Sequence, residues 1–595
     1  MNLIAELRRR NVPRAAILYA GVVWALAQGI SQLSPAVGLP DWSTRWFLIA
    51  AAIGLPFWIA FAWFYEFTPQ GLRRESEVAD DAPSRHSTAR KLDFAIIAVL
   101  AIAVVLLLTD RFVSHPSATA GSGVVATIPQ MSVAVLPLDN QSGDKGQQFF
   151  SDGLSEDLIN ALSQFAGLKV ISRNSAFQFR DSKLSSAAIG QALGVAHLLE
   201  GSVRILGSEV RISAELVNAA DGSTLWSENY DRPFKDLFAL QDDITRAVAA
   251  ALKARLLGSS GTRARSDRPP SGSLDAWNAY SRGRFFARSP SPENGRTSIE
   301  FFEQAVALDP RYARAYAELS LAWARLGATF LGGDEQRQAF AKARVAVAQA
   351  LQIDPDQAAA HAARGWLLFW ADLDWKGAEA EYRRALELAP GDAVAQFALS
   401  GIFSTLGRVQ QAIPLMRQAI AGDPRNGADW YWLGWSLVAV GQLDEAEQAA
   451  RRAVELFPGG AFFPTGLVIV QIVRGEDEAA LASAQLEPPS GTWRDVALAF
   501  ALQRGHDPAA ADAALRKLIA EQSDASSYQI AEVYALRDDA DNTFAWLDRA
   551  WANRDPGISR LLADPFILRF QHDPRFAAFC TKVGLPTTTD AQAMP

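Results

Sequence analysis

The chain of 595 residues carries 57 Lys and Arg against 65 Asp and Glu, a formal net charge of −8, and its length implies several domains of about 100–200 residues each. This acidic balance excludes the overall positive field that attracts nucleic acid, so we expect no nucleic-acid partner. The single cysteine, Cys580, excludes an intramolecular disulfide and a cysteine-rich metal site.

Three apolar windows near the N-terminus predict membrane-spanning helices. Residues 15–33 and 46–64 are 19-residue windows without a formal charge, each about 28 Å long as a helix, which matches the apolar core of a bilayer. Residues 92–109 form the third window. A cleaved signal peptide is the alternative for the first window, but it lacks a clear small-residue cleavage site and a second span follows closely. We therefore expect residues 1–112 to be a membrane anchor that contacts the lipid bilayer.

Positive charge in the short loops predicts the orientation of the anchor, because Lys and Arg resist translocation. The N-terminal tail carries four such residues and the 66–92 loop carries five, whereas the loop between the first two spans has Arg45 alone. We expect the N-terminus and the 66–92 loop to be cytoplasmic. Everything from about residue 112 onward is then expected outside the cytoplasm.

Small residues recur at every fourth position of the first span, at Gly21, Ala25 and Gly29. This spacing could let a second helix approach closely and support a homo-oligomer. Small residues that only face lipid are the equal alternative.

The next segment predicts an α/β sandwich. Residues 113–131 are small, polar and interrupted by Gly and Pro, which is typical of a linker. Over residues 132–256 the apolar periodicity then predicts the order β-α-β-α-β-β-β-α. The expected strands are 132–138, 168–173, 199–205, 210–216 and 224–231, and the expected helices are 149–165, 185–193 and 237–256.

Six blocks of this segment, among them VAVLPLDNQSGD, FFSDGLSEDLINALS and LGVAHLLEGSVR, resemble the TolB amino-terminal-like, or FlgO-like, domain. The similarity covers about residues 132–252. In bacterial relatives this domain follows a membrane anchor and precedes tetratricopeptide repeats. Together with the orientation expected from the Lys and Arg bias, the resemblance implies a bacterial inner-membrane protein whose residues from about 112 onward are periplasmic. Some relatives carry a DNA-binding or nucleotide cyclase domain before the anchor, but only about 14 residues precede the first span here, so we expect no such domain.

The motif SDGLSED places Asp152, Glu156 and Asp157 in the first turns of a predicted helix. The helix macrodipole alone favours acidic residues there. A metal site or an acid–base pair is the alternative, and we predict the macrodipole role. His197 has no second histidine near it in the sequence, and we predict a packed, hydrogen-bonded core residue.

The remainder of the chain predicts an all-α tetratricopeptide-repeat solenoid. Residues 257–273 are expected to be a second linker. Beyond it, prolines spaced by 45, 35, 34 and 34 residues follow the period of this repeat, at Pro310, Pro355, Pro390, Pro424 and Pro458. Alanines such as Ala446 and Ala453 fall where the motif requires small residues. We predict a superhelix with a concave groove over residues 274–585, closed by a C-terminal cap.

An insertion of 11 residues near Thr329–Arg337 interrupts one repeat. It contains Gly332, Gly333, Asp334 and Glu335, a tetrapeptide similar to the signature of diguanylate cyclases. That chemistry requires a complete α/β cyclase domain around the turn, and here both flanks are repeat helices. We predict a flexible inter-helix loop.

Tryptophans supply the candidate residues for a partner-binding groove, because aromatic side chains carry much of the energy at binding hot spots. Trp432 and Trp435 are the main candidates, with an exposed groove and a buried core as equal alternatives, and Trp366 and Trp370 join them. Trp430 occupies a core position of the motif and is predicted to be internal. The groove suits a protein or peptide partner, as an amphipathic or an extended segment.

No phosphate-binding glycine loop, GxSxG elbow, catalytic carboxylate pair or metal-ligand spacing occurs in the sequence. We therefore expect no enzymatic activity, cofactor or metal. The leading hypothesis is a scaffold, anchored in the inner membrane, that presents the α/β module and the repeat groove to the periplasm for protein–protein interaction. The alternative is a membrane signal-transduction sensor that relays binding of a ligand or partner to a separate cytoplasmic effector.

Overall fold

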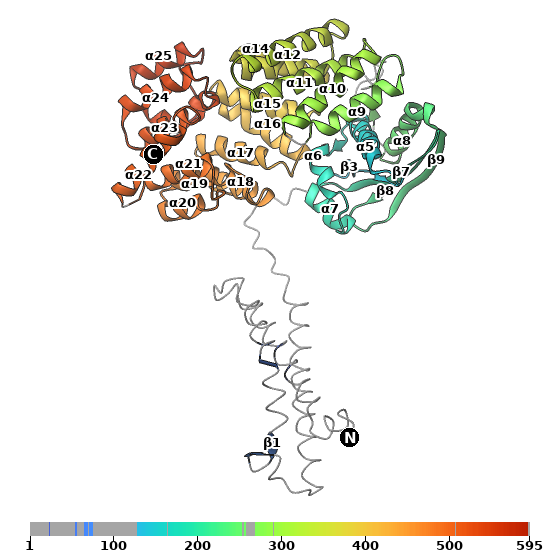
Figure 1. Cartoon of the computed structure of the whole chain (residues 1–595), viewed down its shortest axis with the longest axis horizontal. Helices are drawn as coiled ribbons and strands as arrows, with labels where there is room; N and C mark the ends of the chain where they lie inside the picture. Colours follow the sequence, from blue (N-terminus) through green and yellow to red (C-terminus); the bar gives the residue numbers. More distant parts are fainter. Residues whose placement is uncertain are drawn as a thin grey trace. The chain divides into compact units, whose positions relative to one another are not determined.

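The computed structural model describes residues 128–592, apart from 164, 253–254, 257–267, 289–290 and 506, together with short stretches between residues 19 and 74 (Figure 1). The chain divides into two compact units, residues 1–126 and 127–595. The three predicted spans lie almost wholly outside the described residues, as do Gly21, Ala25 and Gly29. Among the residues that are described, no helix is both long and apolar enough to cross a bilayer.

The first unit contains one described hairpin, in which β1 (Tyr65–Thr68) pairs antiparallel with β2 (Gly71–Arg74). It lies at the start of the predicted 66–92 loop.

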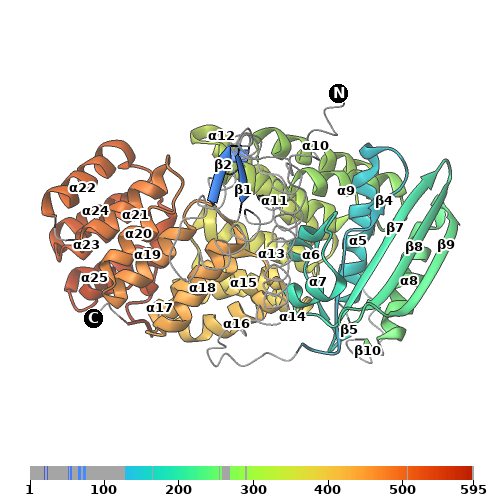
Figure 2. The same ribbon diagram turned by 90° about the horizontal axis from the view of Figure 1, so that it is seen from below.

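The second unit begins with a mixed sheet whose strand order is β6-β3-β7-β8-β9. The central β3 runs parallel to β6 and to β7, and β7, β8 and β9 form an antiparallel meander, drawn as long neighbouring strands in Figure 2. The short β4 pairs with β7. The bounds are β3 (Ser132–Val135), β4 (Asp139–Asn140), β6 (Lys169–Val170), β7 (His197–Leu206), β8 (Glu209–Asn218) and β9 (Thr224–Pro233). A two-residue turn at Gly207 joins β7 to β8, and its φ of +62° suits glycine.

Helices cover both faces of this sheet. Because successive side chains of a strand point to opposite faces, Val133 and Val135 pack with α5 (Gln148–Leu162) and α8 (Leu237–Ala251), while Ala134 packs on the other face with α7 (Ser186–Leu193). The resulting α/β domain (residues 132–251) confirms the predicted fold class and most of the predicted elements.

Two predicted strands are shorter than expected, and two predicted helices end earlier than expected. The strand predicted at 132–138 is β3, which ends at Val135. The helices predicted at 149–165 and 237–256 end at Leu162 and Ala251, and their last predicted residues lie in a separate antiparallel pair, β5 (Phe165–Ala166) with β10 (Arg255–Leu256).

The pattern at 168–173 predicts a strand, but β6 covers only Lys169 and Val170. The backbone N–H of Ile171 still donates to the carbonyl oxygen of Val133 at 3.0 Å, whereas that of Ser172 donates away from the sheet, to the carbonyl oxygen of Gly422 at 2.8 Å. The chain then turns into the short helix α6 (Arg173–Ala176) and the 3₁₀ helix η3 (Phe177–Phe179).

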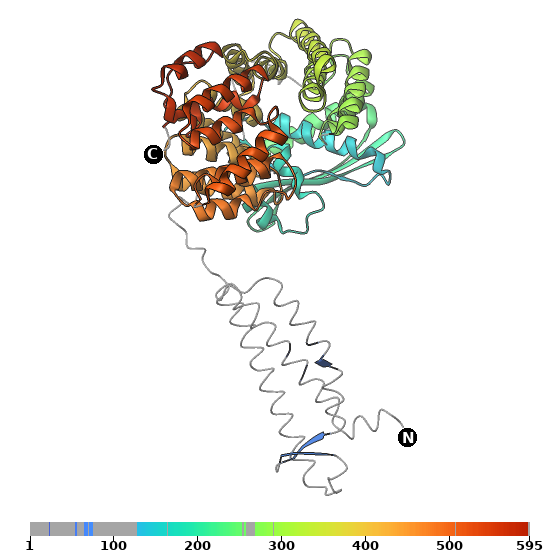
Figure 3. The ribbon, with the colours of Figure 1, turned by 60° about the vertical axis from the view of Figure 1, so that its left-hand side comes forward.

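Helical pairs form the rest of the second unit, the repeat array (residues 274–582), whose later members stack side by side in Figure 3. The helices are α9 (Leu274–Phe286), α10 (Pro292–Leu308), α11 (Ala313–Phe330), α12 (Gly333–Ile353), α13 (Ala358–Leu367), α14 (Trp375–Leu388), α15 (Ala393–Thr405), α16 (Val409–Gly422), α17 (Gly427–Ala439), α18 (Leu443–Leu456), α19 (Phe463–Arg474), α20 (Asp477–Ala484), α21 (Thr492–Leu502), α22 (Pro508–Gln522), α23 (Ser527–Leu536), α24 (Ala540–Ala552) and α25 (Pro574–Lys582).

The repeat register is confirmed by the prolines and the small residues. The second helix of each of the five repeats ends two residues before its proline, as α18 ends at Leu456 before Pro458. Ala446 and Ala453 have no exposed surface. A Cβ atom on Gly434 would lie 3.2 Å from the carbonyl oxygen of Ala446, so the paired helices cross closely there and a larger residue would require the backbone of α18 to shift.

The predicted loop near Thr329–Arg337 is wrong. The insertion lengthens the two helices of its pair, α11 and α12, and the turn between them is short. Gly333 accepts a φ of +55° at the start of α12, and Asp334 and Glu335 occupy its first turn, where the macrodipole favours acidic residues.

After α24 the chain turns into two 3₁₀ helices, η6 (Pro556–Ala563) and η7 (Ile567–Phe570), before α25. The large side chains of this region, such as Leu561, Phe566 and Phe576, are buried. They belong to the same hydrophobic core as α14 to α24, so this region closes the array.

Candidate functional site

The four predicted groove tryptophans lie in two places. Trp366 and Trp370 are neighbours, with ring centroids 6.4 Å apart, and Trp370 is 44% exposed. Trp432 and Trp435 lie together on α17, with ring centroids 6.5 Å apart. Trp432 is half-buried, but Trp435 is only 5% exposed. Of the two alternatives for Trp435, an exposed groove or a buried core, the structure shows the buried core. The other three tryptophans retain exposed surface.

The C-terminal region covers Trp435. The guanidinium of Arg560, on η6, lies 4.9 Å from the Trp435 ring centroid and 5.0 Å from that of Tyr528. Its Nη2 lies 3.4 Å from a carboxylate oxygen of Glu532. Burial is the largest influence on Arg560 and opposes its charge, but Glu532 together with Tyr431, Tyr528 and Asp564 outweighs burial and raises the pKa of the guanidinium. A buried cation between two rings therefore fills the space that a partner would need at Trp435.

Beyond α25, the tail (residues 588–592) crosses two consecutive repeats. The N–H of Asp590 donates to the carbonyl oxygen of Gly407 at 2.9 Å, and the N–H of Gln592 donates to that of Ala439 at 2.6 Å. A carboxylate oxygen of Asp590 accepts from the N–H of Val409 at 2.7 Å, at the start of α16. The tail thus binds the turns of its own repeats as an extended peptide would.

Helix α9, the first of the repeat array, packs on α5 of the α/β domain. Trp277 is fully buried in the core of the α/β domain, 5.4 Å from Phe150 between ring centroids. Its Nε1 donates to a carboxylate oxygen of Asp157 at 2.9 Å. A Cβ atom on Gly153 would lie 2.9 Å from Oγ of Ser281, so this glycine lets the two helices approach.

The acidic residues of SDGLSED do not have the predicted role. Because α5 begins at Gln148, Asp152 and Glu156 lie beyond its first turn, and they are 2% and 1% exposed. Four arginines surround these two carboxylates: Arg180 and Arg288 pair with Asp152, and Arg173, Arg284 and Arg288 pair with Glu156. These carboxylates are buried, and a buried carboxylate requires charged partners, so ion pairs rather than the helix macrodipole stabilise them.

This ionic cluster links the two parts of the second unit. Arg173 and Arg180 belong to the α/β domain, while Arg284 and Arg288 lie on and just after α9. Burial lowers the pKa of Arg288 to about 10, with Asp152 opposing the shift. Burial, and to a smaller extent the charge of Arg284, lowers the pKa of Arg173 to about 9. Positive charge is therefore in excess over the two carboxylates here.

A second contact joins the α/β domain to the turn between α16 and α17. Ser175 and Asn174 donate from their side chains to the buried carboxylate of Asp423. In the other direction, the backbone N–H of Arg425 donates to Oγ of Ser175 at 2.9 Å, and its Nε donates to the side chain of Gln178 at 2.7 Å. The α/β domain therefore holds the repeat array at two places that are far apart in the sequence.

A cavity of about 380 Å³ lies at this second contact. It is lined by Arg173, Asn174, Phe177, Gln178, Arg425, Asn426 and Phe457. Sequence reasoning missed these residues, because they come from three separate segments and show no motif or spacing.

No metal site is apparent in the part of the chain that the structure describes, since no group of three His, Cys, Asp or Glu side chains could hold an ion there. His197 is 9% exposed and its Nδ1 lies 3.0 Å from the carbonyl oxygen of Ser132. The prediction of a packed, hydrogen-bonded histidine is confirmed. Cys580 is buried, and burial raises the pKa of its thiol to about 12.

Two sequence families match parts of the chain. The model described as a tetratricopeptide repeat matches residues 404–462. The model described as the second domain of a HilA/YgeH-like transcriptional regulator matches residues 129–247, which is the α/β domain. The chain therefore contains tetratricopeptide repeats, a fold whose known members bind proteins or peptides.

Two curated proteins are similar to parts of the chain. "Putative adenylate cyclase 3" of Rhizobium meliloti (strain 1021) is 36% identical over 192 residues, 32% of this chain and 32% of the relative. "Small glutamine-rich tetratricopeptide repeat-containing protein 2" of Mycosarcoma maydis is 32% identical over 94 residues, 16% of this chain and 27% of the relative. The chain thus spans about a third or less of the length of the curated relatives it matches.

Among solved structures, pilF of Pseudomonas aeruginosa is 20% identical, covers 38% of this chain and 99% of its own, and has a TM-score of 0.31. PilW, described as a widely conserved type IV pilus biogenesis factor, is 15% identical, covers 43% of this chain and 97% of its own, and has a TM-score of 0.28. At these scores the likeness carries no argument about what the chain does.

Proposed function

We propose that the chain is a membrane-anchored scaffold that binds other proteins through its repeat array. The observation that carries the proposal is the confirmed repeat register together with the tetratricopeptide-repeat match over residues 404–462. Stacked helical pairs present extended surfaces with which such arrays bind peptides and proteins. The chain acts in this proposal by holding partners rather than by converting a substrate.

The proposed contact surface contains three of the four predicted tryptophans. Trp370 is the most exposed of them and lies next to the half-buried Trp366, and Trp432 is half-buried on α17. Large amphipathic rings lose little entropy on binding and dominate interface energies. Trp435 is left out of the proposal because Arg560 already covers its ring.

The proposal keeps the anchor and its orientation. Three apolar windows within residues 1–112 support an anchor, proposed to lie in a bacterial inner membrane. The excess of Lys and Arg in the N-terminal tail and the 66–92 loop supports a periplasmic position for residues from about 112 onward. Alkaline phosphatase fused after Ser132 should be active and a fusion near Ser84 inactive. The reverse pattern would overturn the orientation.

Self-association through the first span is a separate part of the proposal, and it rests on the small residues at every fourth position of that span. Disulfide trapping of the full-length chain in membranes provides the test. Ala25→Cys should crosslink two copies under mild oxidation. Val23→Cys is the control, because positions two apart lie on nearly opposite sides of a helix. Equal crosslinking of the two variants, or none in either, would contradict an interface at Ala25.

The resemblance of the α/β domain to the TolB amino-terminal-like domain also remains a proposal. It is supported by the six blocks of similarity and by the sheet that those blocks form between residues 132 and 251. In this proposal the α/β domain is a second interaction module, held to the repeat array by the contacts of α9 and of the α16–α17 turn.

Photo-crosslinking in intact cells tests the scaffold directly. A photoreactive residue replaces Trp370 or Trp432 in the full-length chain, and the control replaces Phe330, an exposed side chain at the end of α11. We expect one recurring adduct from the tryptophan positions that is absent from the control. Equal adduct patterns at all three positions would mean that the tryptophans mark no partner site.

A second candidate is the sensor, which would relay binding to a separate cytoplasmic effector. The cavity between the α/β domain and the α16–α17 turn favours it, since a ligand there would touch both parts of the second unit. A cytoplasmic protein that crosslinks to the 66–92 loop would support the sensor.

A further inference from the structure

The cavity of about 380 Å³ at the second contact has walls that hydrogen bonds hold in place. One wall comes from α6 and η3 of the α/β domain, and the other comes from the repeat array, from the α16–α17 turn and from Phe457 directly after α18. Ser175 donates to Asp423, and Arg425 donates to Ser175 and to Gln178, and these bonds join the two walls. The volume of the cavity lies in the range of about 300–1,000 Å³ that is typical of small-molecule sites.

The lining is positively charged. Arg173 and Arg425 contribute one guanidinium from each wall, and neither Asp nor Glu is among the residues that line the cavity. The Phe177 ring, also in the lining, lies 4.4, 5.4 and 5.6 Å from the guanidinium carbons of Arg173, Arg180 and Arg288. An anion entering this cavity meets cations from both walls and no opposing carboxylate on its surface.

Arg425 has hydrogen-bonding capacity to spare. Its Nε donates to Gln178, and among the residues that the structure describes no hydrogen bond from its two terminal nitrogens is found. Burial, followed by the charge of Arg452, lowers the pKa of this guanidinium. A half-buried cation with unused donors is stabilised by an anion, which arginine can bind through two parallel N–H donors.

The remaining lining suits a flat ring. Phe457 is 44% exposed although it is a large apolar side chain, and it lines the cavity together with Phe177. The amides of Asn174, Gln178 and Asn426 add polar groups that can orient a ligand. Such a mixture of rings, amides and cations is typical of sites for small organic ions.

We propose that this cavity binds a small organic anion, a carboxylate or phosphate group attached to a planar ring, with Arg173 and Arg425 as its anion-binding residues. The ligand then bridges the α/β domain and the repeat array, and its binding stabilises their contact. This site is independent of the protein-binding surface proposed above, so either proposal can fail without the other.

The test uses the full-length chain in detergent and two probes, phenyl phosphate and benzoate, with phenol as the neutral control. Calorimetry measures the dissociation constant, and hydrogen exchange locates the protected backbone. We expect saturable binding of at least one anion, no binding of phenol, and slower exchange at residues 173–179 and 423–426. Binding of both anions would indicate that any anionic group suffices, and binding of one would identify the group.

The key variant is Arg425→Gln, which removes the charge while the backbone bonds of residue 425 to the α/β domain remain possible. Arg417→Gln is the matched control, because Arg417 is an exposed arginine on α16 that pairs with Glu445. We expect Arg425→Gln to weaken anion binding about tenfold or more, the effect of losing a charge-assisted hydrogen bond, and Arg417→Gln to leave it unchanged. Phe457→Ala should weaken the binding of ring-bearing anions more than the binding of inorganic phosphate.

Three results would overturn the proposal. The first is that neither phenyl phosphate nor benzoate shows saturable binding at millimolar concentration. The second is binding that Arg425→Gln leaves intact, since the anion would then bind elsewhere. The third is a protein partner whose acidic side chain crosslinks into the cavity in an Arg425-dependent way while both probes fail to bind.

Discussion

The indole Nε1 of Trp277 donates a hydrogen bond of 2.9 Å to a carboxylate oxygen of Asp157, which joins the first helix of the repeat array to the α/β domain. The same carboxylate oxygen accepts from Gln241 on α8, also at 2.9 Å. Asp157 thus connects three helices, α5, α8 and α9, and the Trp277 ring completes the core between them. The α/β domain is therefore packed on α9 rather than only tethered to it.

Trp277→Ala should lower the free energy of unfolding by about 3–5 kcal/mol, the usual cost of truncating a fully buried aromatic side chain. Trp277→Phe keeps a ring but removes the donor, and should cost about 1–2 kcal/mol. Denaturant unfolding measures both. Trp546→Phe, on a half-buried residue of α24, is the control and should change little. A Trp277→Ala chain as stable as the parent would contradict the packing of α9 on α5.

Glu156→Gln removes one charge from the buried ionic cluster and leaves Arg173, Arg284 and Arg288 without that carboxylate. We expect a loss of about 3–5 kcal/mol, because breaking a buried pair leaves uncompensated charge. Glu445→Gln is the matched control, since its partner Arg417 and Glu445 itself are both about half exposed, and it should cost less than about 1 kcal/mol. Comparable losses in the two variants, measured by denaturant unfolding, would argue against a structural role for the cluster.

The sequence predicts the repeated parts of this molecule well. Alternation along β7 and β8 predicts the hairpin and its turn at Gly207, and the spacing from Pro310 to Pro458 predicts the repeat register. Both signals are local or periodic, so each residue contributes to the same pattern.

The contacts between distant segments could not be predicted in this way. Glu156 meets Arg284 and Arg288 only because α9 returns to α5, and Arg560 reaches Trp435 from 125 positions further along the chain. A tryptophan at a position that could face the groove looks the same in the sequence whether a partner protein or the chain's own C-terminal region covers its ring. The helical insertion at residues 329–337 was missed for a local reason, since paired glycines are as typical of loops as of a helix start.

Asp429 should make stability depend on pH. Burial, followed by the charge of Asp423, raises the pKa of its carboxyl from 3.8 to about 8. Between pH 4 and 8 the folded state therefore holds a proton that the unfolded state has lost, so stability falls as pH rises through this window and levels off above it. Asp429→Asn, which stays neutral, should flatten the decline and be more stable than the parent at pH 8 by on the order of a few kcal/mol.

Unfolding midpoints in urea at pH 5 and pH 8 provide the measurement for this variant. The hydrogen bond from Asn426 to the Asp429 carboxylate oxygen can be kept by the amide oxygen of asparagine. An unchanged difference between the two midpoints in Asp429→Asn would assign the pH dependence to other groups.

The tail contributes through Asp590, which accepts hydrogen bonds at the start of α16. Asp590→Ala should cost about 0.5–2 kcal/mol, the usual effect of losing an N-cap, and should speed hydrogen exchange at Val409 and Gln410. Gly407→Ala should release the tail as well, because its φ is +71° and the new Cβ would lie 2.8 Å from the carbonyl oxygen of Thr588. If exchange at Val409 stays slow in both variants, the tail does not hold these turns.

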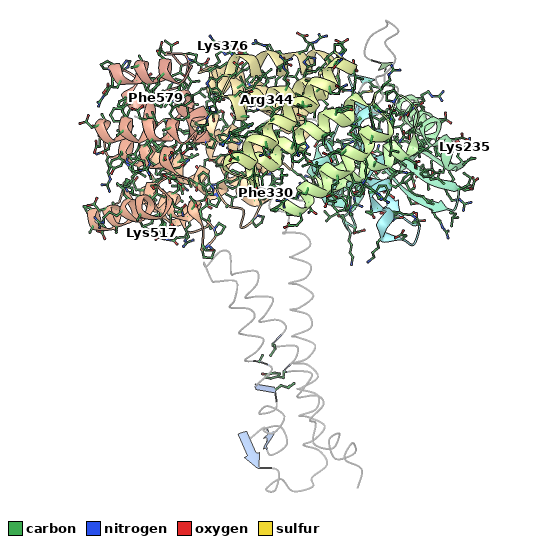
Figure 4. The ribbon with its side chains drawn as sticks, turned by 45° about the horizontal axis from the view of Figure 1, so that its top comes forward. Lys235, Phe330, Arg344, Lys376, Lys517 and Phe579 are labelled. Carbon is green, nitrogen blue, oxygen red and sulfur yellow. The ribbon has the colours of Figure 1, made fainter. Side chains whose placement is uncertain are left out.

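Crosslinking with mass spectrometry in intact cells tests the central claim, that the chain acts by binding a partner protein. Lys376 and Lys517 on the repeat array and Lys235 in the α/β domain are exposed and serve as reactive sites (Figure 4). We predict that the array lysines crosslink repeatedly to one or a few partner proteins and that the yield falls when Trp366 and Trp370 are both replaced by alanine. Crosslinks confined to this chain, at every lysine and in every growth condition, would contradict the scaffold.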